Sequence, residues 1–267
     1  MGYLISGNLS GSLPRSSFEF LSNVSVKIYR TQKGKDNLRP PKGVKGDIQV
    51  LDGNEVAFKR ELLVGEGTTD ANGYYKVKLA DTYNRGPVSI DVVITEVPYQ
   101  KGKQDKRVQC LVKTLQPFWR KQSEHHHFSF NYRFPYEFWG VLRAQFDAWM
   151  IFGHVKSTGN IPTVEGLRVT AYDVDWITDD LLGTAVTDSS GFFRIDYTSS
   201  DFKKTFLTPL INVETPLTAL PGPGVYFKIA SKEGDLLLEE ASTMGKTDER
   251  KNVPHCYYVE LSINTKR

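Results

Sequence analysis

The chain contains two copies of one sequence pattern, and this repeat constrains the fold more than any other feature. In the first copy, NVSVKIY at residues 23–29 is followed by GEGTTDANGYYKV at residues 65–77. In the second copy, GLRVTAY at residues 166–172 is followed by GTAVTDSSGFFRI at residues 183–195. A chain that carries the same local pattern twice is expected to fold as two similar units.

Each part of the pattern predicts a local structure. Apolar residues alternate with polar ones in the first segment of each copy, as in a half-buried β-strand. The motif Thr-Asp-x-x-Gly in the second segment is typical of a tight hairpin, because the aspartate accepts backbone N–H bonds and the glycine takes a positive φ. Tyr29 thus corresponds to Tyr172, and Gly73 corresponds to Gly191. With about seven strands expected per copy, each copy is predicted to form a two-sheet sandwich.

Composition agrees with two globular all-β units. Of the 267 residues, 39% are hydrophobic and 12% aromatic, against 24% charged, so each half has enough apolar surface for its own core. The net charge of +3 is too small to indicate nucleic-acid binding, which needs a concentrated basic face. No apolar run approaches the ~20 residues of a membrane-spanning helix.

The cellular compartment is predicted from two weak signals. The first residues, MGYLISG, lack the basic and apolar regions of a secretory signal, so residence in the cytoplasm is the default expectation. Cys110 and Cys256 lie in different halves of the chain and do not suggest a disulfide framework. We expect both to be buried, free thiols.

The two copies differ by an insertion and are separated by a linker. The insertion, at about residues 31–61 of the first copy, is rich in Lys, Arg, Gly and Pro; its segments 47–50 and 55–58 predict a β-hairpin or an extended loop. Between the copies, Trp139, Leu142 and Phe146 are spaced as on one face of a short helix that follows Pro135. The predicted division is a sandwich at 1–133, a helical linker at 134–147 and a sandwich at 148–267.

The second copy resembles the transthyretin-like (prealbumin-like) and carboxypeptidase-regulatory-like modules. The resemblance is carried by IFGHV at 151–155, AYDVD at 171–175, DDLLG at 179–183 and TDSSGF at 187–192, and more loosely by residues 5–7 and 65–74 of the first copy. It implies two tandem prealbumin-like β-sandwiches. Such modules occur as accessory parts of bacterial surface, toxin and injection-machine proteins, so the resemblance also implies a role in interaction or assembly.

An acidic loop in the second copy is the best candidate for metal binding. Calcium takes six to eight oxygen ligands, and carboxylates in closely spaced loops supply them. The alternative is that these aspartates cap turns and are solvated. The first copy has Arg30-Thr31-Gln32-Lys33 at the equivalent place. The candidate ligands are Asp173, Asp175, Asp179, Asp180 and Asp188.

Two other groups of residues are weighed against simpler explanations. His125 and His127 would share one face of a strand, but two imidazoles are too few for a zinc site, and a polar turn before the strand at 128–132 explains them as well. Trp176, in the acidic loop, is the one tryptophan that we expect to be exposed, as a sugar-binding residue would be. No strained Gly-x-Ser-x-Gly nucleophile turn is present.

These observations predict a protein that is not an enzyme. We expect a structural or protein-binding subunit of a larger bacterial assembly, related to surface or injection machinery, without a cofactor. Its partners would be other protein subunits or further copies of itself, joined in part through edge strands. The chain would be made in the cytoplasm and then incorporated into a released or surface assembly. A calcium- or carbohydrate-binding module and a metal-dependent enzyme on the same fold are the alternatives.

Overall fold

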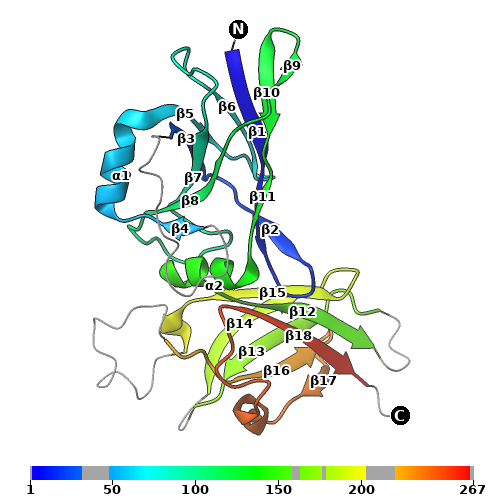
Figure 1. Cartoon of the computed structure of the whole chain (residues 1–267). Coiled ribbons are helices and arrows are strands. Elements are labelled where there is room, and N and C mark those ends of the chain that lie inside the picture. The colour runs from blue at the N-terminus through cyan, green and yellow to red at the C-terminus, as the bar shows by residue number, and fades with distance from the viewer. Residues whose placement is uncertain (1, 32–47, 158–162, 176–178, 203–219, 265–267) are drawn as a thin grey trace. The chain divides into compact units, whose positions relative to one another are not determined.

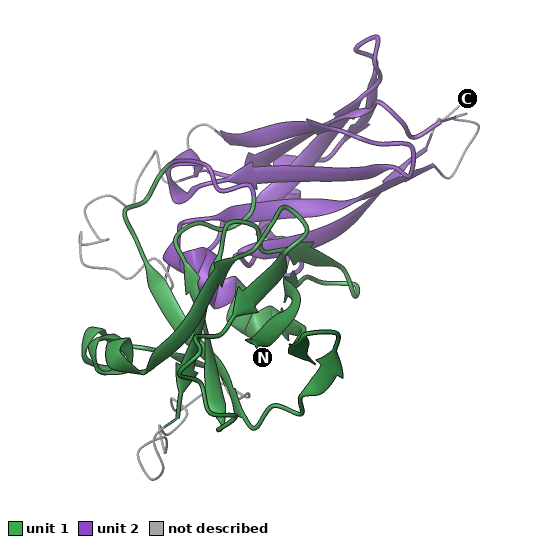
Figure 2. Cartoon of the chain, turned by 90° about the horizontal axis from the view of Figure 1, so that it is seen from above, with its two compact units in different colours: residues 1–98, 103–139 green, residues 99–102, 140–267 purple. Residues whose placement is uncertain are grey.

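The computed structural model describes residues 2–31, 48–157, 163–175, 179–202 and 220–264. The chain divides into two compact units, coloured separately in Figure 2. The first unit comprises residues 1–98 and 103–139, and the second comprises residues 99–102 and 140–267. The boundary falls between Trp139 and Gly140, inside a helix. The described residues are mostly in strands, so the all-β prediction is confirmed.

Two sheets build the first unit (Figure 1). One has the order β11-β1-β10-β9, with β6 and β2 also paired to the long strand β1; the other has the order β4-β8-β7-β3-β5. The strands are β1 (Gly2–Ser12), β2 (Phe18–Phe20), β3 (Ser25–Arg30), β4 (Gln49–Val50), β5 (Leu63–Thr68), β6 (Tyr74–Lys78), β7 (Val88–Ile94), β8 (Val108–Leu115), β9 (Arg120–Gln122), β10 (His125–Ser129) and β11 (Tyr132–Phe134).

The second unit has a three-stranded and a four-stranded sheet, with the orders β15-β12-β18 and β14-β13-β16-β17. Its short 3-10 helices span Ser199–Asp201 and Ser242–Lys246. The strands are β12 (Trp149–Ser157), β13 (Arg168–Asp173), β14 (Asp180–Val186), β15 (Phe192–Tyr197), β16 (Val225–Ala230), β17 (Leu236–Glu239) and β18 (Cys256–Ile263).

The two units share one strand order. The sheet β6-β1-β10 matches β15-β12-β18, and β5-β3-β7-β8 matches β14-β13-β16-β17. In the first unit, β1 pairs antiparallel with β6 and parallel with β10. In the second unit, β12 pairs antiparallel with β15 and parallel with β18 in the same way. The register shift between β3 and β5 at Ile28/Tyr29 recurs between β13 and β14 at Ala171/Tyr172. Tyr29 and Tyr172 therefore occupy equivalent places, as the repeat predicts.

The predicted tight turn is present in both copies with the same hydrogen bonds, but it does not close a hairpin. The strands that it joins, β5 to β6 and β14 to β15, belong to different sheets, so in each unit the turn crosses from one sheet to the other. Gly73 has a φ of +68° and Gly191 a φ of +79°. Asp70 Oδ1 accepts the N–H groups of residues 72 and 74, and Asp188 Oδ1 accepts those of residues 190 and 192. A Cβ on Gly73 would lie 2.3 Å from a backbone oxygen of β1, and one on Gly191 would lie 2.4 Å from the equivalent oxygen of β12. Only glycine satisfies both the torsion angle and the space.

Each unit has its own core between its sheets. The alternating residues of the repeat point inward: Val26, Ile28, Val169 and Ala171 are all fully buried. In the second unit these residues join one cluster with Phe193, Phe227 and other apolar residues of both sheets. Period-two alternation therefore predicted the buried face of the strands.

The insertion in the first copy is partly helical, so the predicted β-hairpin is wrong there. Helix α1 spans Gly53–Lys59, followed by a 3-10 helix at Arg60–Leu62. Asp52 caps α1 by accepting the N–H of Glu55, whose side chain accepts the N–H of Asp52 in return. This reciprocal capping box stabilises a helix where a turn was expected. Residues 32–47 of the insertion lie outside the described residues.

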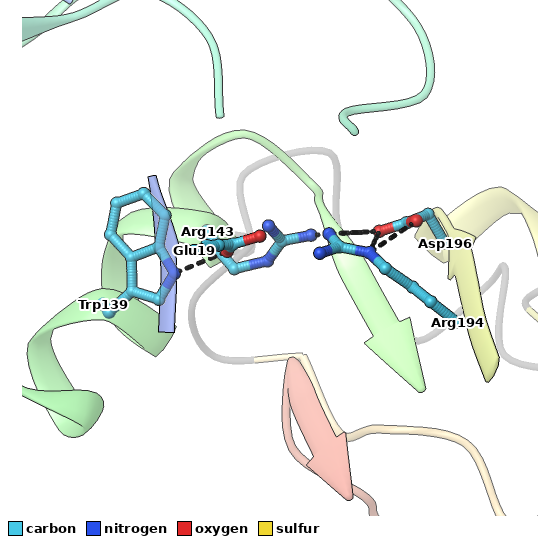
Figure 3. Close-up of polar contacts among 5 residues, drawn as sticks. All are labelled: Glu19, Trp139, Arg143, Arg194 and Asp196. Carbon is cyan, nitrogen blue, oxygen red and sulfur yellow. Dashed lines mark hydrogen bonds and ion pairs between the residues drawn. The ribbon is translucent and has the colours of Figure 1, made fainter. Parts of the chain in front are cut away.

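A helix is also found in the segment predicted as the linker. Helix α2 spans Tyr136–Gln145, and its apolar side chains Trp139 and Leu142 are buried, as is Phe146 just beyond its end. Trp139 Nε1 donates to Glu19 Oε1 at 2.7 Å, and its ring fills the space above Gly11 (Figure 3). The first turn of α2 is therefore an integral part of the first unit.

Candidate functional site

Four of the five predicted calcium ligands lie where β13 ends and β14 begins. Asp173 is buried, and its Oδ1 accepts the N–H of Gly224 at 2.7 Å. Asp179 accepts two hydrogen bonds, from the Tyr226 hydroxyl at 2.7 Å and from the N–H of Asp175 at 3.2 Å. These contacts show what the aspartates do within the fold: they tie the strand ends to β16.

Asp173 is the carboxylate of this group that is hardest to ionise. Burial raises the pKa of Asp173 to about 7, and the neighbouring charges of Asp175, Asp180 and Asp179 add to the rise. Asp180 Oδ2 is buried and accepts no hydrogen bond in the described part of the chain.

The fifth predicted ligand, Asp188, lies elsewhere. It follows β14, whereas Asp180 begins that strand, so about six strand residues, or ~20 Å, separate the two. One ion cannot bind both, and Asp188 instead caps the β14–β15 turn. Among the described residues, no group of three His, Cys, Asp or Glu side chains is placed to hold a metal ion. Calcium binding by the other four aspartates stays a prediction.

The three consecutive histidines belong to β10 itself rather than to a turn before it, so that expectation is wrong. His127 Nε2 lies 2.8 Å from Ser6 Oγ on β1. His126 points to the opposite face, where its ring stacks on Tyr3 in a cluster with Tyr83 and Trp119. The histidines therefore pack against two different sets of neighbours.

The other predicted residues are placed as follows. Cys110 and Cys256 are buried free thiols, as expected, and burial raises the pKa of Cys110 to about 12. Trp139 and Trp149 are buried. Trp176 lies outside the described residues, so its exposure stays a prediction. The described helices include none long and apolar enough to cross a membrane.

The outer face of the four-stranded sheet in the second unit carries exposed apolar side chains that the repeat did not reveal. On β14, Leu181 is 53% exposed and Val186 is 65% exposed, and on β17 Leu236 is 54% exposed. Leu181 is paired with Tyr172, whose ring stacks on that of Tyr226 at 5.2 Å. Val186 is paired with Arg168, and Leu236 with Ala230, at the other end of these strands. A sequence signal was present: LLGTAV carries adjacent apolar residues, which place apolar side chains on both faces of β14.

In the first unit, the equivalent outer face is covered. All seven residues of β7 are buried, including Asp91, which points away from the core. Lys59, at the end of α1, places its Nζ 2.5 Å from Asp91 Oδ1 and 4.6 Å from the centre of the Tyr29 ring. Gln109 donates to Asp91 Oδ2 at 2.7 Å. Burial raises the pKa of Asp91, and Lys59 opposes that rise.

Comparison with known proteins shows no family. No family model matches the chain, and no curated protein matches it. Among solved structures, a 9R-lipoxygenase from Cyanothece PCC8801 matches with 14% identity and a TM-score of 0.27; the match covers 51% of this chain and 17% of that one. The chain thus spans less than a fifth of that protein.

Two further solved structures match over most of this chain. The SpaE basal pilin from Lactobacillus rhamnosus GG has 10% identity over 99% of this chain and 100% of its own, with a TM-score of 0.28. A putative cell adhesion protein from Bacteroides ovatus has 10% identity over 88% of both chains, with a TM-score of 0.31. At TM-scores this low, none of these likenesses bears on what the chain does.

Proposed function

We propose that this chain is a non-catalytic, protein-binding subunit of a larger bacterial assembly, built from two prealbumin-like sandwiches. The observation that supports it is the outer face of the four-stranded sheet in the second unit. Leu181, Val186 and Leu236 are each more than half exposed there. Large apolar side chains that are this exposed on a sheet face are costly in water and occur on surfaces that another protein covers.

Further features of this face support a protein contact. The stacked Tyr172 and Tyr226 rings lie beside Leu181 at one end of the face. The next row is polar: its Lys228 lies 5.7 Å from the centre of the Tyr172 ring and pairs with Glu239 at 2.8 Å. Exposed aromatic rings next to polar side chains are typical of protein interfaces. The partner is another subunit or a second copy of this chain, and the sequence resemblance to accessory modules of surface and injection machinery supports the same role.

Light scattering coupled to size-exclusion chromatography tests the proposal. We expect the purified chain to form a defined oligomer, or to retain a partner from its host lysate, and the L181K/V186K variant to lose that association. The matched control is Phe118→Lys, because Phe118 is 78% exposed but lies in the first unit. A chain that stays monomeric and retains no partner contradicts the proposal, as does an association that L181K/V186K leaves intact.

The calcium alternative has a separate test. The melting temperature is measured with calcium and then with chelator, for the parent chain and for Asp175→Ala and Asp180→Ala. The proposed function predicts no calcium-dependent shift. A shift that either substitution abolishes would establish a calcium-binding module instead.

A further inference from the structure

Basic residues are concentrated in one sheet of the first unit. The strands β1, β6, β9, β10 and β11 contain no aspartate or glutamate, and the acidic residue of β2, Glu19, is buried and accepts a hydrogen bond from Trp139. They contain eight lysine, arginine and histidine residues: Lys76, Lys78, Arg120, Lys121, His125, His126, His127 and Arg133. The net charge of +3 for the whole chain conceals this local excess.

The strand register places most of these residues on one face. Ile5 and Leu9 of β1 are fully buried, so the even-numbered residues of β1 point outward. Lys78, His127 and Arg120 lie in one row with Leu4, because each is paired to the next across β6, β1, β10 and β9. We call this outward face the β1 platform; it comprises Tyr74, Lys76, Lys78, Arg120, His125, His127, Arg133, Phe18 and Phe20.

The platform's long cations have no acidic partner. Among the described residues, Lys76, Lys78, Arg120 and Arg133 form no ion pair. The matching sheet of the second unit differs, since Lys156 pairs with Glu260 at 2.8 Å and Arg194 pairs with Asp196 at 2.8 Å (Figure 3). Unpaired like charges repel one another, and a bound polyanion would relieve that repulsion.

Exposed aromatic rings lie on the same face. Tyr74 is 42% exposed, and Phe20 and Phe18 on β2 are 41% and 42% exposed. Tyr74 is paired with Asn8, and Phe20 is paired with Ser10, whose other neighbour is Arg133. Between these rings β1 contributes the short polar outward residues Ser6, Asn8, Ser10 and Ser12. Ser6 and Ser10 are only 7% exposed and are hydrogen-bonded to His127 and Arg133, so the rings and cations themselves form the accessible part of this face.

We propose that the β1 platform binds single-stranded nucleic acid. A single strand carries one phosphate and one planar base per unit, and so matches both the unpaired cations and the exposed rings. Sheet-based binders of single strands use the same combination of stacking and phosphate contacts. An acidic polysaccharide matches the cations but has no planar ring to stack. The inference lies in the first unit and is independent of the proposed assembly face.

Fluorescence anisotropy with labelled oligothymidylate and oligouridylate of ~20 nucleotides tests the proposal, because such probes exceed the ~4–16 nucleotides of one binding platform. Four phosphate contacts predict a log–log salt slope of about −3, so affinity should fall roughly 50-fold between about 50 and 200 mM salt. The K76E/K78E variant should lose at least about half of that slope. Tyr74→Ala should weaken binding by roughly fivefold or more, the effect of losing one stacked base.

The controls separate this proposal from general attraction to anions. The matched variant K246E/K251E reverses the charge at two exposed lysines of the second unit and should bind the oligonucleotides like the parent chain. Thermal melting of each variant checks that it is folded. The proposal is overturned if no oligonucleotide binds at about 50 mM salt. It is equally overturned if K76E/K78E binds like the parent, or if heparin binds more tightly than the oligonucleotides while Tyr74→Ala has no effect.

Discussion

The two units have the same strand order but different outer faces. On the sheet that contains β3 and β7, Lys59 at the end of α1 covers the outer face, whereas Leu181 and Val186 are exposed on the corresponding β13–β16 sheet of the second unit. On the sheet that contains β1, the long cations are unpaired, whereas those of the corresponding β12 sheet are paired. The shared positions, such as Gly73 and Gly191, serve turns and cores. In a duplicated fold, the inner residues preserve the architecture and the outer faces are where the copies acquire separate roles.

The covered face should depend strongly on its buried ion pair. Lys59→Ala leaves the Asp91 carboxylate buried without the Lys59 cation, and Asp91→Ala leaves the Lys59 ammonium buried without the Asp91 carboxylate. We expect either change to lower the free energy of unfolding of the first unit by ~3–5 kcal/mol, measured by urea denaturation. The double variant K59M/D91L should recover much of the loss, since no buried charge remains. A loss no larger than that of an exposed pair would mean that α1 does not close this face.

The acidic strand end of the second unit should make stability depend on pH. The pKa of Asp173 is about 7 in the folded chain, above its unfolded value of ~3.9. Its stabilising contribution is therefore complete below pH ~4 and is lost as the pH rises to about 7. Asp173→Asn removes this dependence while keeping an acceptor for Gly224, so it should be the more stable form at pH ~8, by at most ~4 kcal/mol.

Unfolding curves of the parent and Asp173→Asn at several pH values check this expectation. Because groups far from Asp173 titrate alike in both proteins, the difference between them reports Asp173 together with the carboxylates that interact with it. If the free energies of unfolding of the parent and of Asp173→Asn differ by the same amount at pH ~4 and pH ~8, the carboxyl group of Asp173 ionises normally and the expectation is wrong.

The equivalence of the two turns predicts matched costs. Gly73→Ala and Gly191→Ala each force a side chain into a positive φ, at ~1–3 kcal/mol, and each also meets a backbone oxygen. Gly102→Ala is the control, because Gly102 has a φ of +76° but open space around it. Thermal melting should show larger losses at Gly73 and Gly191 than at Gly102. Clearly unequal losses at Gly73 and Gly191 would break the comparison between the units.

The exposed pair on the second unit should matter least. Lys228 on β16 is the counterpart of Asp91 on β7. Lys228 precedes Ile229, which is paired with Val169, just as Asp91 precedes Val92, which is paired with Val26. Its partner Glu239 is solvent-exposed, so Lys228→Ala should change stability by only ~0–1 kcal/mol. A larger loss in urea denaturation would show that this face is more tightly held than its exposure indicates.

The sequence predicted the architecture well because the information is local. Alternation at Val26 and Val169 and the Asp-x-x-Gly turns depend on near neighbours only, and both are present as predicted. That each turn crosses between sheets instead of closing a hairpin depends on distant strand pairing, which the motif does not contain. Helix α1 was missed although its signal was present: Asp52 and Glu55 have the spacing of a capping box, but the apolar residues Val56 and Phe58 alternate as in a strand.

The sites depend on distant residues, which the sequence could not bring together. Asp173 is close to Asp180 in sequence, yet its main contact is Gly224, which no spacing predicts. Asp188 was grouped with the others by sequence proximity, although a whole strand separates it from them. The β1 platform was hidden because its cations come from four separate strands and the net charge averages them with acidic residues elsewhere.

The parallel pairing of the first and last strands has a mechanical consequence. Because β1 runs parallel to β10, and β12 runs parallel to β18, the chain enters each unit at one end of this pair and leaves at the other. Tension applied along the backbone would slide the two strands past each other lengthwise, loading all their hydrogen bonds at once rather than one after another. Tension along the backbone would thus load this strand pair of each unit in shear.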